Sequence, residues 1–169
     1  QVMQGDGTNE NLLGILNQPN TQSYQQTNAA NAATEPKSDA LRRAATKALV
    51  ANYPTTGYVL NPFDWEQIEL QKDGEGRYML ITNVVVGAEA RIWRQPVVET
   101  VAMPQGKFVT GAWGIGAQLY DRQVANGRTA EQHADFFVRN AVAILVEERL
   151  AFAVKRPEAF VIGNFFTPA

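Results

Sequence analysis

Two neighbouring glutamates, Glu147 and Glu148, lie inside an apolar run, and this setting could support acid–base chemistry. Successive side chains of a β-strand point to opposite faces, so only one of the two could be buried there. One interpretation is an ion pair between a glutamate and Arg139, Arg149 or Arg156. The other is a carboxylate in apolar surroundings, which holds a proton more readily and could act as a proton acceptor. The residues alone favour the ion pair.

Other motifs with catalytic or ligand-binding potential are weak. The only histidine, His133, lies in a polar stretch, so a histidine-based metal site or catalytic triad is not expected. Asp6, Thr8 and Glu10 have the spacing of a calcium loop, but the glycine and the final glutamate of such a loop are missing. The glycines of residues 111–116 do not match a dinucleotide-binding fingerprint. We therefore expect neither a metal nor a cofactor.

Composition limits the class of protein. The chain has 169 residues, of which 45% are hydrophobic and 19% charged, and this balance is typical of a globular domain. A net charge of −2 lacks the basic excess of nucleic-acid-binding domains, so we expect no specific nucleic-acid binding. No window approaches the roughly 20 apolar residues of a membrane helix, so we expect no membrane partner. The start, Gln1-Val2-Met3-Gln4, does not resemble a signal peptide, and we expect the gene product to continue upstream.

Two helices are predicted in the first half of the chain. Ser38 could cap a helix over residues 39–52. Asn61 could cap a second helix with Pro62 at its first position, ending at the turn pair Asp73-Gly74. The apolar face of the first helix is predicted to comprise Leu41, Ala45, Ala48 and Leu49.

Short strands and long polar segments make up the rest. Residues 17–36 are predicted to form a long surface loop or extended segment, and residues 126–135 a turn or loop. Residues 136–154 fit both strand and helix periodicity, so the pattern leaves that choice open. Strands are predicted around Tyr58-Val59-Leu60, Ile92, Pro96-Val97-Val98, Val101, Lys107-Phe108-Val109, Gln118-Leu119-Tyr120 and Ala159-Phe160-Val161-Ile162. Helices and strands without regular alternation indicate an α+β fold.

A series of short segments along nearly the whole chain matches, in order, the pattern of a known family. They include Gly5-Asp6-Gly7-Thr8, Val59-Leu60-Asn61-Pro62, Asp64-Trp65, Lys72-Asp73, Pro96-Val97-Val98, Gln118-Leu119-Tyr120-Asp121-Arg122, Phe136-Phe137-Val138-Arg139-Asn140 and Glu147-Glu148-Arg149-Leu150. In this order they resemble the Hong Kong 97-type major capsid family of tailed bacteriophages. The resemblance covers the part of such a protein that follows its long spine helix.

The resemblance implies a fold and a division into domains. The fold is the α+β Hong Kong 97-type capsid fold, with an axial domain and part of a peripheral domain. Residues 1–13 would connect from an upstream peripheral segment, residues 14–123 would form the axial domain, and residues 124–169 would supply peripheral strands. The ambiguous stretch, residues 136–154, is then expected to be rich in strand.

The function implied by the resemblance is structural. The protein would be a major capsid protein that self-assembles through pentamers and hexamers into an icosahedral shell enclosing DNA. Repeated symmetric contacts achieve this without an active site, so no enzyme is expected. The protein would be found in the virion, and in the host cytoplasm during assembly. This chain alone is expected to be a monomer or a small oligomer.

One property of the family is chemical. Some members join neighbouring subunits by an isopeptide bond between a lysine and an asparagine, with a glutamate as base. Asn140 matches the acceptor position and Glu147 the base, and the lysine would come from a loop upstream of this chain. Otherwise the two residues would be structural polar groups at a subunit boundary.

Two alternatives remain open from the sequence. Within the same fold, the chain could belong to an encapsulin-type nanocompartment shell. From a different class, it could be a small soluble α+β ligand-binding or enzyme domain, which would require a pocket with convergent polar groups.

Overall fold

The computed structural model describes residues 1–26, 35–79, 89–130, 138–140 and 142–165. The chain divides into two compact units. We call them the core unit, comprising Gln1–Gln118 with Val154–Ala169, and the ribbon unit, Leu119–Ala153. Helices and strands occur together without regular alternation, which confirms the α+β class.

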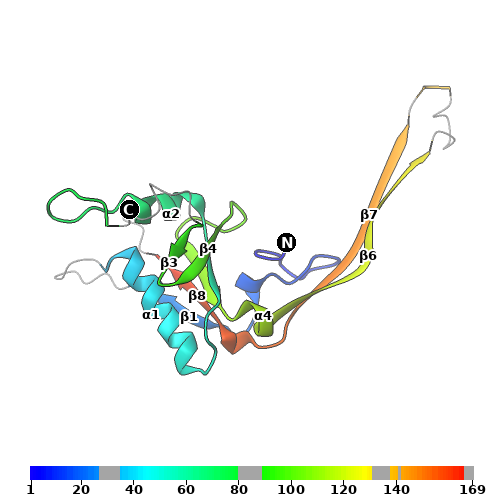
Figure 1. Cartoon of the computed structure of the whole chain (residues 1–169). Coiled ribbons are helices and arrows are strands. Elements are labelled where there is room, and N and C mark those ends of the chain that lie inside the picture. Colours follow the sequence, from blue (N-terminus) through cyan, green and yellow to red (C-terminus); the bar gives the residue numbers. More distant parts are fainter. Residues whose placement is uncertain (27–34, 80–88, 131–137, 141, 166–169) are drawn as a thin grey trace. The chain divides into compact units, whose positions relative to one another are not determined.

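The core unit is built on a six-stranded mixed sheet with the order β1-β8-β5-β2-β4-β3 (Figure 1). Strand β8 runs parallel to β1 and antiparallel to β5, while β2 runs antiparallel to β5 and parallel to β4. The strands are β1 (Gln22–Gln25), β2 (Gly57–Leu60), β3 (Arg91–Ile92), β4 (Gln95–Glu99), β5 (Lys107–Gly111) and β8 (Phe160–Asn164). Short helical turns are η1 (Ile15–Asn17), α4 (Trp113–Gly116) and η2 (Pro157–Ala159).

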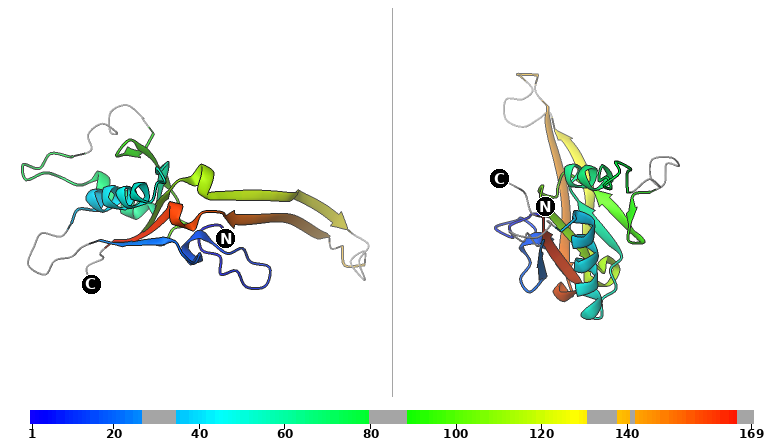
Figure 2. Two further views of the ribbon diagram at one scale, coloured as in Figure 1. Left: turned by 90° about the horizontal axis from the view of Figure 1, so that it is seen from below. Right: turned by 90° about the vertical axis from the view of Figure 1, so that its left-hand side faces the viewer.

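Helix α1 (Lys37–Val50) covers one face of this sheet, across β1, β8 and β5 (Figures 1 and 2). Its buried face consists mainly of alanines, which let the helix backbone approach the strands closely. The buried residues of α1 are Ala40, Leu41, Ala44, Ala45 and Ala48. Together with Trp65 and Ile68 of helix α2 (Pro62–Glu69), they form one hydrophobic core with the strand residues below.

Two sequence predictions about α1 are wrong. Ser38 is not the cap, because the helix already begins at Lys37 after Pro36, and no side chain caps it. Leu49 does not belong to the core face and is 53% exposed. It follows Ala48 by one residue, which is about 100° around the helix, so the last turn directs it away from the sheet.

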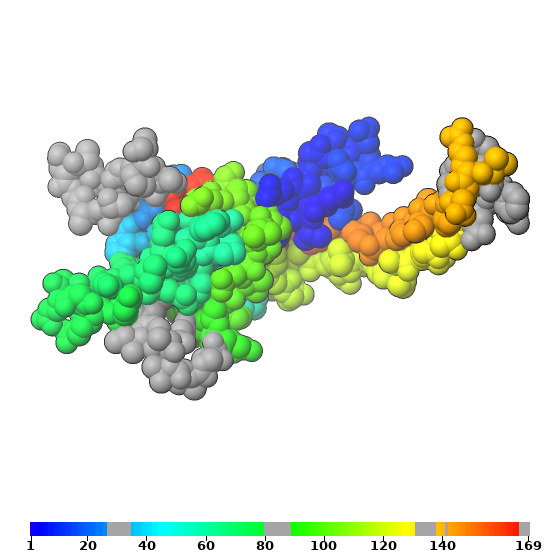
Figure 3. Space-filling model, turned by 90° about the horizontal axis from the view of Figure 1, so that it is seen from above, coloured from blue at the N-terminus to red at the C-terminus, as the bar shows by residue number. Residues whose placement is uncertain are grey.

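Helix α2 begins as predicted and ends earlier. The Asn61 side chain accepts a hydrogen bond from the Phe63 amide at 3.1 Å, and Pro62 occupies the first helical position. The helix ends at Glu69, and a hairpin over residues 71–79 follows. Asp73 shapes this hairpin by accepting from the amides of Glu75 and Arg77, both at 2.9 Å. The hairpin extends outward from the rest of the core unit (Figures 2 and 3).

The ribbon unit consists of two long strands. Strand β6 (Ala117–Ala130) pairs with β7 (Ala143–Val154), and the two run in opposite directions (Figure 1). The ambiguity over residues 136–154 is therefore resolved in favour of strand from residue 143 onward. The loop predicted for residues 126–135 is wrong over 126–130, which continue β6, while 131–135 lie outside the described residues.

Two other sequence predictions can be compared with the fold. The predicted loop over residues 17–36 contains η1's last residue and strand β1, and residues 27–34 lie outside the described part. The predicted domain boundary at residue 123 differs from the bounds of these two units. Strand β8 lies after residue 123 in the sequence, yet it belongs to the six-stranded sheet of the core unit. Their identity as axial and peripheral domains stays a prediction. No helix among the described residues is long and apolar enough to cross a membrane.

Candidate functional site

The ribbon unit exposes an unusual number of large apolar side chains. In β7, Ile144 is 72% exposed and Val146 is 67% exposed, and their neighbour Leu145 is also exposed. The other exposed apolar residues of this unit are Leu119, Tyr120, Val124, Val138 and Val142. Contiguous exposed apolar surface is typical of protein–protein contact sites, so the ribbon is the first candidate for a functional surface.

The start of β7 exposes large apolar side chains on both faces. Side chains alternate along β7, so Ile144 and Val146 lie on one face and Leu145 lies on the other. An ordinary half-buried strand would place polar residues on its solvent face. A strand with apolar residues on both faces is adapted to burial on both sides. The start of β7 therefore has the composition of a buried strand in an exposed position.

A two-stranded ribbon is also weakly stable by itself. In water, isolated hairpins are marginal, and independent stability normally needs a third strand or a covering helix. Neither β6 nor β7 has a further strand partner among the described elements. Their outer edges carry unpaired backbone groups, which are a template for pairing with another chain. Additional protein packed against the ribbon would supply the missing covering layer and pair the free backbone groups.

The sequence-predicted site residues lie in this unit. Asn140 is exposed in the turn before β7 and has a positive φ of 52°, which Asn and Asp tolerate better than most residues. Glu147 is the fifth residue of β7 and is exposed, as is Glu148 on the opposite face. The expected ion pair is not formed, because neither glutamate has a salt bridge among the described residues. Asn140 and Glu147 share no hydrogen bond in this part of the chain.

The remaining sequence candidates do not form a site. Asp6 accepts hydrogen bonds from the Thr8 amide, the Thr8 hydroxyl and the Asn11 amide group, and these bonds lower the pKa of the Asp6 carboxyl. This is a polar turn rather than an ion-binding loop. In the described ranges, no three His, Cys, Asp or Glu side chains lie close enough to hold a metal. His133 lies outside the described residues.

The exposed apolar surface of the ribbon was not predicted from the sequence. The signal was present in the run from Val142 to Val146, which contains no polar residue. Such a run is usually interpreted as a buried strand or a buried helix. Only the three-dimensional structure shows that Val142, Ile144, Leu145 and Val146 are exposed.

Comparison with known proteins identifies the family. A model of the phage capsid family matches residues 1–165. The chain belongs to the phage capsid family. The major capsid protein of Enterobacteria phage HK97 is 35% identical over 165 residues, covering 98% of this chain. This chain spans 42% of the length of that relative.

Solved structures of similar fold agree. The capsid of a native GTA particle, computed with C5 symmetry, superposes with a TM-score of 0.75 at 21% identity, covering 98% of this chain and 59% of that one. A structure from Gordonia phage Cozz gives a TM-score of 0.68 at 19% identity, covering 99% and 56%. A virus-like particle from Pyrococcus furiosus gives 0.60 at 21% identity, covering 89% and 57%. The predicted Hong Kong 97-type capsid fold is thereby confirmed.

Proposed function

We propose that this chain is the part of a phage major capsid protein that builds an icosahedral shell around DNA by self-association through pentamers and hexamers. The observation that carries the proposal is the β6–β7 ribbon, which exposes apolar side chains on both faces. The 35% identity to the HK97 major capsid protein supports a phage shell over an encapsulin-type compartment. The shell would place the protein in the virion, after assembly in the host cytoplasm.

The geometry of the ribbon favours contacts with more than one neighbour. Because each face carries large apolar residues, burying both requires protein on both sides. A shell of identical copies supplies that arrangement without a dedicated partner, since the same surfaces repeat around every symmetry axis. The chain alone would remain a monomer or a small oligomer with the ribbon uncovered.

Expression of the gene, together with any sequence that flanks this chain, tests the proposal. Negative-stain microscopy is expected to show uniform closed particles. The double variant Ile144→Ser with Val146→Ser should prevent closed particles, because it removes the apolar side chains of one ribbon face. Leu49→Ser with Val50→Ser is the matched control, since these apolar residues are as exposed but lie on α1. Closed particles from the ribbon variant at the parent's yield would contradict the proposal.

A covalent cross-link is the finer part of this proposal. A lysine Nζ of a neighbouring copy would attack Cγ of Asn140, forming an amide bond as ammonia leaves. Glu147 would accept the proton that the attacking amine loses and pass it to the departing amide nitrogen, which then leaves as ammonia. The exposed turn position of Asn140 makes its side chain accessible to another copy. The apolar residues around Glu147 would exclude water once a neighbour covers that face.

A further inference from the structure

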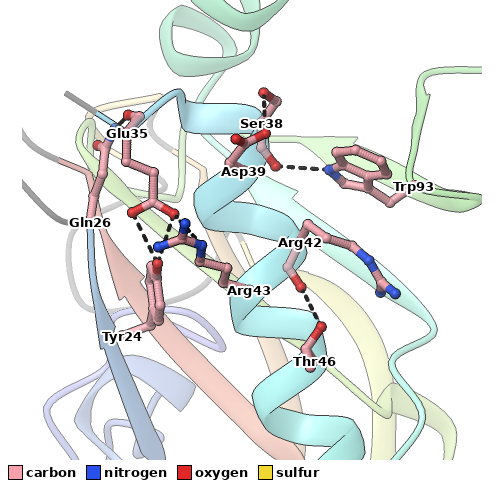
Figure 4. Close-up of polar contacts among 9 residues, drawn as sticks. All are labelled: Tyr24, Gln26, Glu35, Ser38, Asp39, Arg42, Arg43, Thr46 and Trp93. Atoms are coloured by element: carbon pink, nitrogen blue, oxygen red, sulfur yellow. Dashed lines mark hydrogen bonds and ion pairs between the residues drawn. The ribbon is translucent and has the colours of Figure 1, made fainter. Parts of the chain in front are cut away.

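The core unit contains a cavity of about 300 Å³ that the proposed role of the ribbon does not use. It lies where the first turn of α1, the base of the hairpin over residues 71–79 and strand β3 meet. Met79, Ile92 and Trp93 supply apolar lining, and Asp39 and Arg91 supply charges. Figure 4 shows the Trp93 indole beside the start of α1, where Ser38 and Asp39 lie together in the first turn.

Trp93 is held in an unfavourable backbone conformation at this cavity. Trp93 and Arg94 form the two-residue turn between β3 and β4, with φ values of 49° and 71°. Turns with two positive φ values normally use Asn, Asp or Gly, because bulky residues are disfavoured there. Strained backbone positions of this kind concentrate at binding sites. The turn therefore holds a large side chain at a position where Asn, Asp or Gly would fit the backbone with less strain.

The indole is fixed and yet remains open to solvent. Its Nε1 donates a hydrogen bond to the Ser38 carbonyl at 2.8 Å, which sets the orientation of the ring. The residue is still 47% exposed. A tryptophan kept only for core packing would be buried, as Trp65 is at 2%. A preoriented, half-open aromatic ring is instead typical of an anchor point in an interface.

The charges around the ring leave one carboxylate available. Arg91 is paired with Glu89 at 2.9 Å. Asp39 has no ion pair among the described residues, and its carboxylate accepts a 3.4 Å hydrogen bond from the Ser38 hydroxyl. Its position in the first turn of α1 suits the helix dipole, but that role does not require the adjoining cavity. A carboxylate beside an exposed indole is the combination that attracts an ammonium or guanidinium group.

We propose that this cavity receives a lysine or arginine side chain of a neighbouring copy of the chain, seated between Trp93 and Asp39. The inference rests on the proposed shell function, in which copies are packed side by side. Contacts around a ring are heterologous, so a hollow that lies in such a contact meets a different surface of the next copy. Each copy carries exposed basic side chains that could enter the cavity. Among the described residues, no ion pair is formed by Arg42, Lys107, Arg122, Arg128 or Arg149.

Charge substitutions in the assembling protein test this contact. Asp39→Asn should raise the concentration needed for particle formation about tenfold, and Asp39→Lys should prevent particles, because it places a like charge in the cavity. Trp93→Ala should act like Asp39→Asn. The matched control is Glu66→Gln, an exposed acid of α2 outside the cavity. Circular dichroism of each variant before assembly should match that of the parent protein.

The outcomes separate this inference from the proposed function. If the parent protein forms no particles, both fail. If the parent forms particles and the Asp39 and Trp93 variants form them at the same threshold concentration, only the cavity contact is wrong.

Fluorescence gives a second readout that does not depend on yield. Trp93 emission, obtained as the difference between the parent and Trp93→Phe, should become protected from acrylamide when particles form. Unchanged quenching after assembly would overturn the proposal. Ethylammonium chloride serves as a probe for a small cationic ligand. One outcome is that ethylammonium shifts Trp93 emission in the parent but not in Asp39→Asn, while both proteins form particles at the same threshold concentration. The cavity then binds a small cation, and the proposed contact between subunits is wrong.

Discussion

The hydroxyl group of Tyr58 is buried in the core and has no hydrogen-bond partner among the described residues. A buried hydroxyl without a partner costs roughly 1–3 kcal/mol, because it gives up water and gains nothing in return. Tyr58→Phe removes that group and leaves the ring in place. We expect the variant to raise the free energy of unfolding by about 1 kcal/mol, measured by urea denaturation. A loss of stability would show that the hydroxyl does have a partner.

The same residue predicts behaviour at alkaline pH. Burial raises the pKa of Tyr58 to about 12, above its ordinary value of 10.0. Because the folded pKa is the higher one, ionisation of Tyr58 leaves the free energy of unfolding unchanged below pH 10 and lowers it as pH rises toward 12. The parent should therefore lose more stability across that window than Tyr58→Phe, and denaturation at several pH values measures the difference. Parallel curves for the two proteins would contradict this expectation.

Tyr24 is the contrasting tyrosine, because its hydroxyl has a charged partner. It donates to the Glu35 carboxylate, with oxygens at 2.9 and 3.0 Å, and the Arg43 guanidinium lies 3.2 Å from the same carboxylate (Figure 4). The Glu35 side chain is only 5% exposed, so losing a donor leaves a buried charge less well satisfied. Tyr24→Phe should lower the free energy of unfolding by about 1–2 kcal/mol. The opposite signs expected for Tyr24→Phe and Tyr58→Phe make the two variants controls for each other.

At the scale of elements, the two helix starts give a matched test of capping. Asn61 accepts from the Phe63 amide at 3.1 Å and donates to the Met103 carbonyl at 2.7 Å, so Asn61→Ala loses both bonds. We expect a loss of about 1–2 kcal/mol in the free energy of unfolding. Ser38→Ala should change it by less than about 0.5 kcal/mol, because Ser38 caps nothing. Equal losses would mean that Ser38 stabilises α1 by another route.

This contrast shows which information about the helices is local. The pair Asn61-Pro62 predicts a helix start correctly because the cap bond and the fixed proline φ involve only neighbouring residues. Ser38 has the right type for a cap, but Pro36 and Lys37 start α1 earlier. Helix α1 is then held by packing its alanines onto the sheet. The presence of a serine at position 38 does not predict that tertiary contact.

The ribbon shows the limit of pattern analysis for strands. Alternation in β7 is obscured because both faces are apolar, so residues 143–154 fit a strand and a helix equally well. The polar end of β6, residues 126–130, has the composition of a loop, and its pairing with β7 makes it a strand. Glu147 stands out locally as a carboxylate in an apolar run, whereas Asn140 could be selected only through the family resemblance. The Trp93 cavity was not predictable, because Trp-Arg is an unusual sequence for a two-residue turn.

At the scale of the whole molecule, the two units differ in what stabilises them. The core unit has its own hydrophobic core and a six-stranded sheet, whereas the ribbon unit leaves its apolar residues exposed. The core residues of the first are therefore buried within one chain, whereas in the proposed shell other copies would bury the apolar residues of the second. In the proposed shell, assembly would contribute stability where the single chain lacks it.

The proposed cross-link can be tested on assembled particles with three conservative substitutions. Asn140→Asp removes the amide that would release ammonia, and aspartate tolerates the positive φ of 52° at this position. Glu147→Gln removes the proposed base. Glu148→Gln is the matched control, because its side chain lies on the opposite face of β7.

Parent particles and Glu148→Gln particles, boiled in detergent, should give ladders of linked subunits on a denaturing gel. Asn140→Asp and Glu147→Gln should assemble equally well and give single subunits, since the bond would form only after neighbours are in place. Mass spectrometry of the linked peptides should show the loss of one ammonia per bond at Asn140. Single subunits from the parent would rule out the covalent step and leave the apolar contacts of the ribbon to hold the shell together.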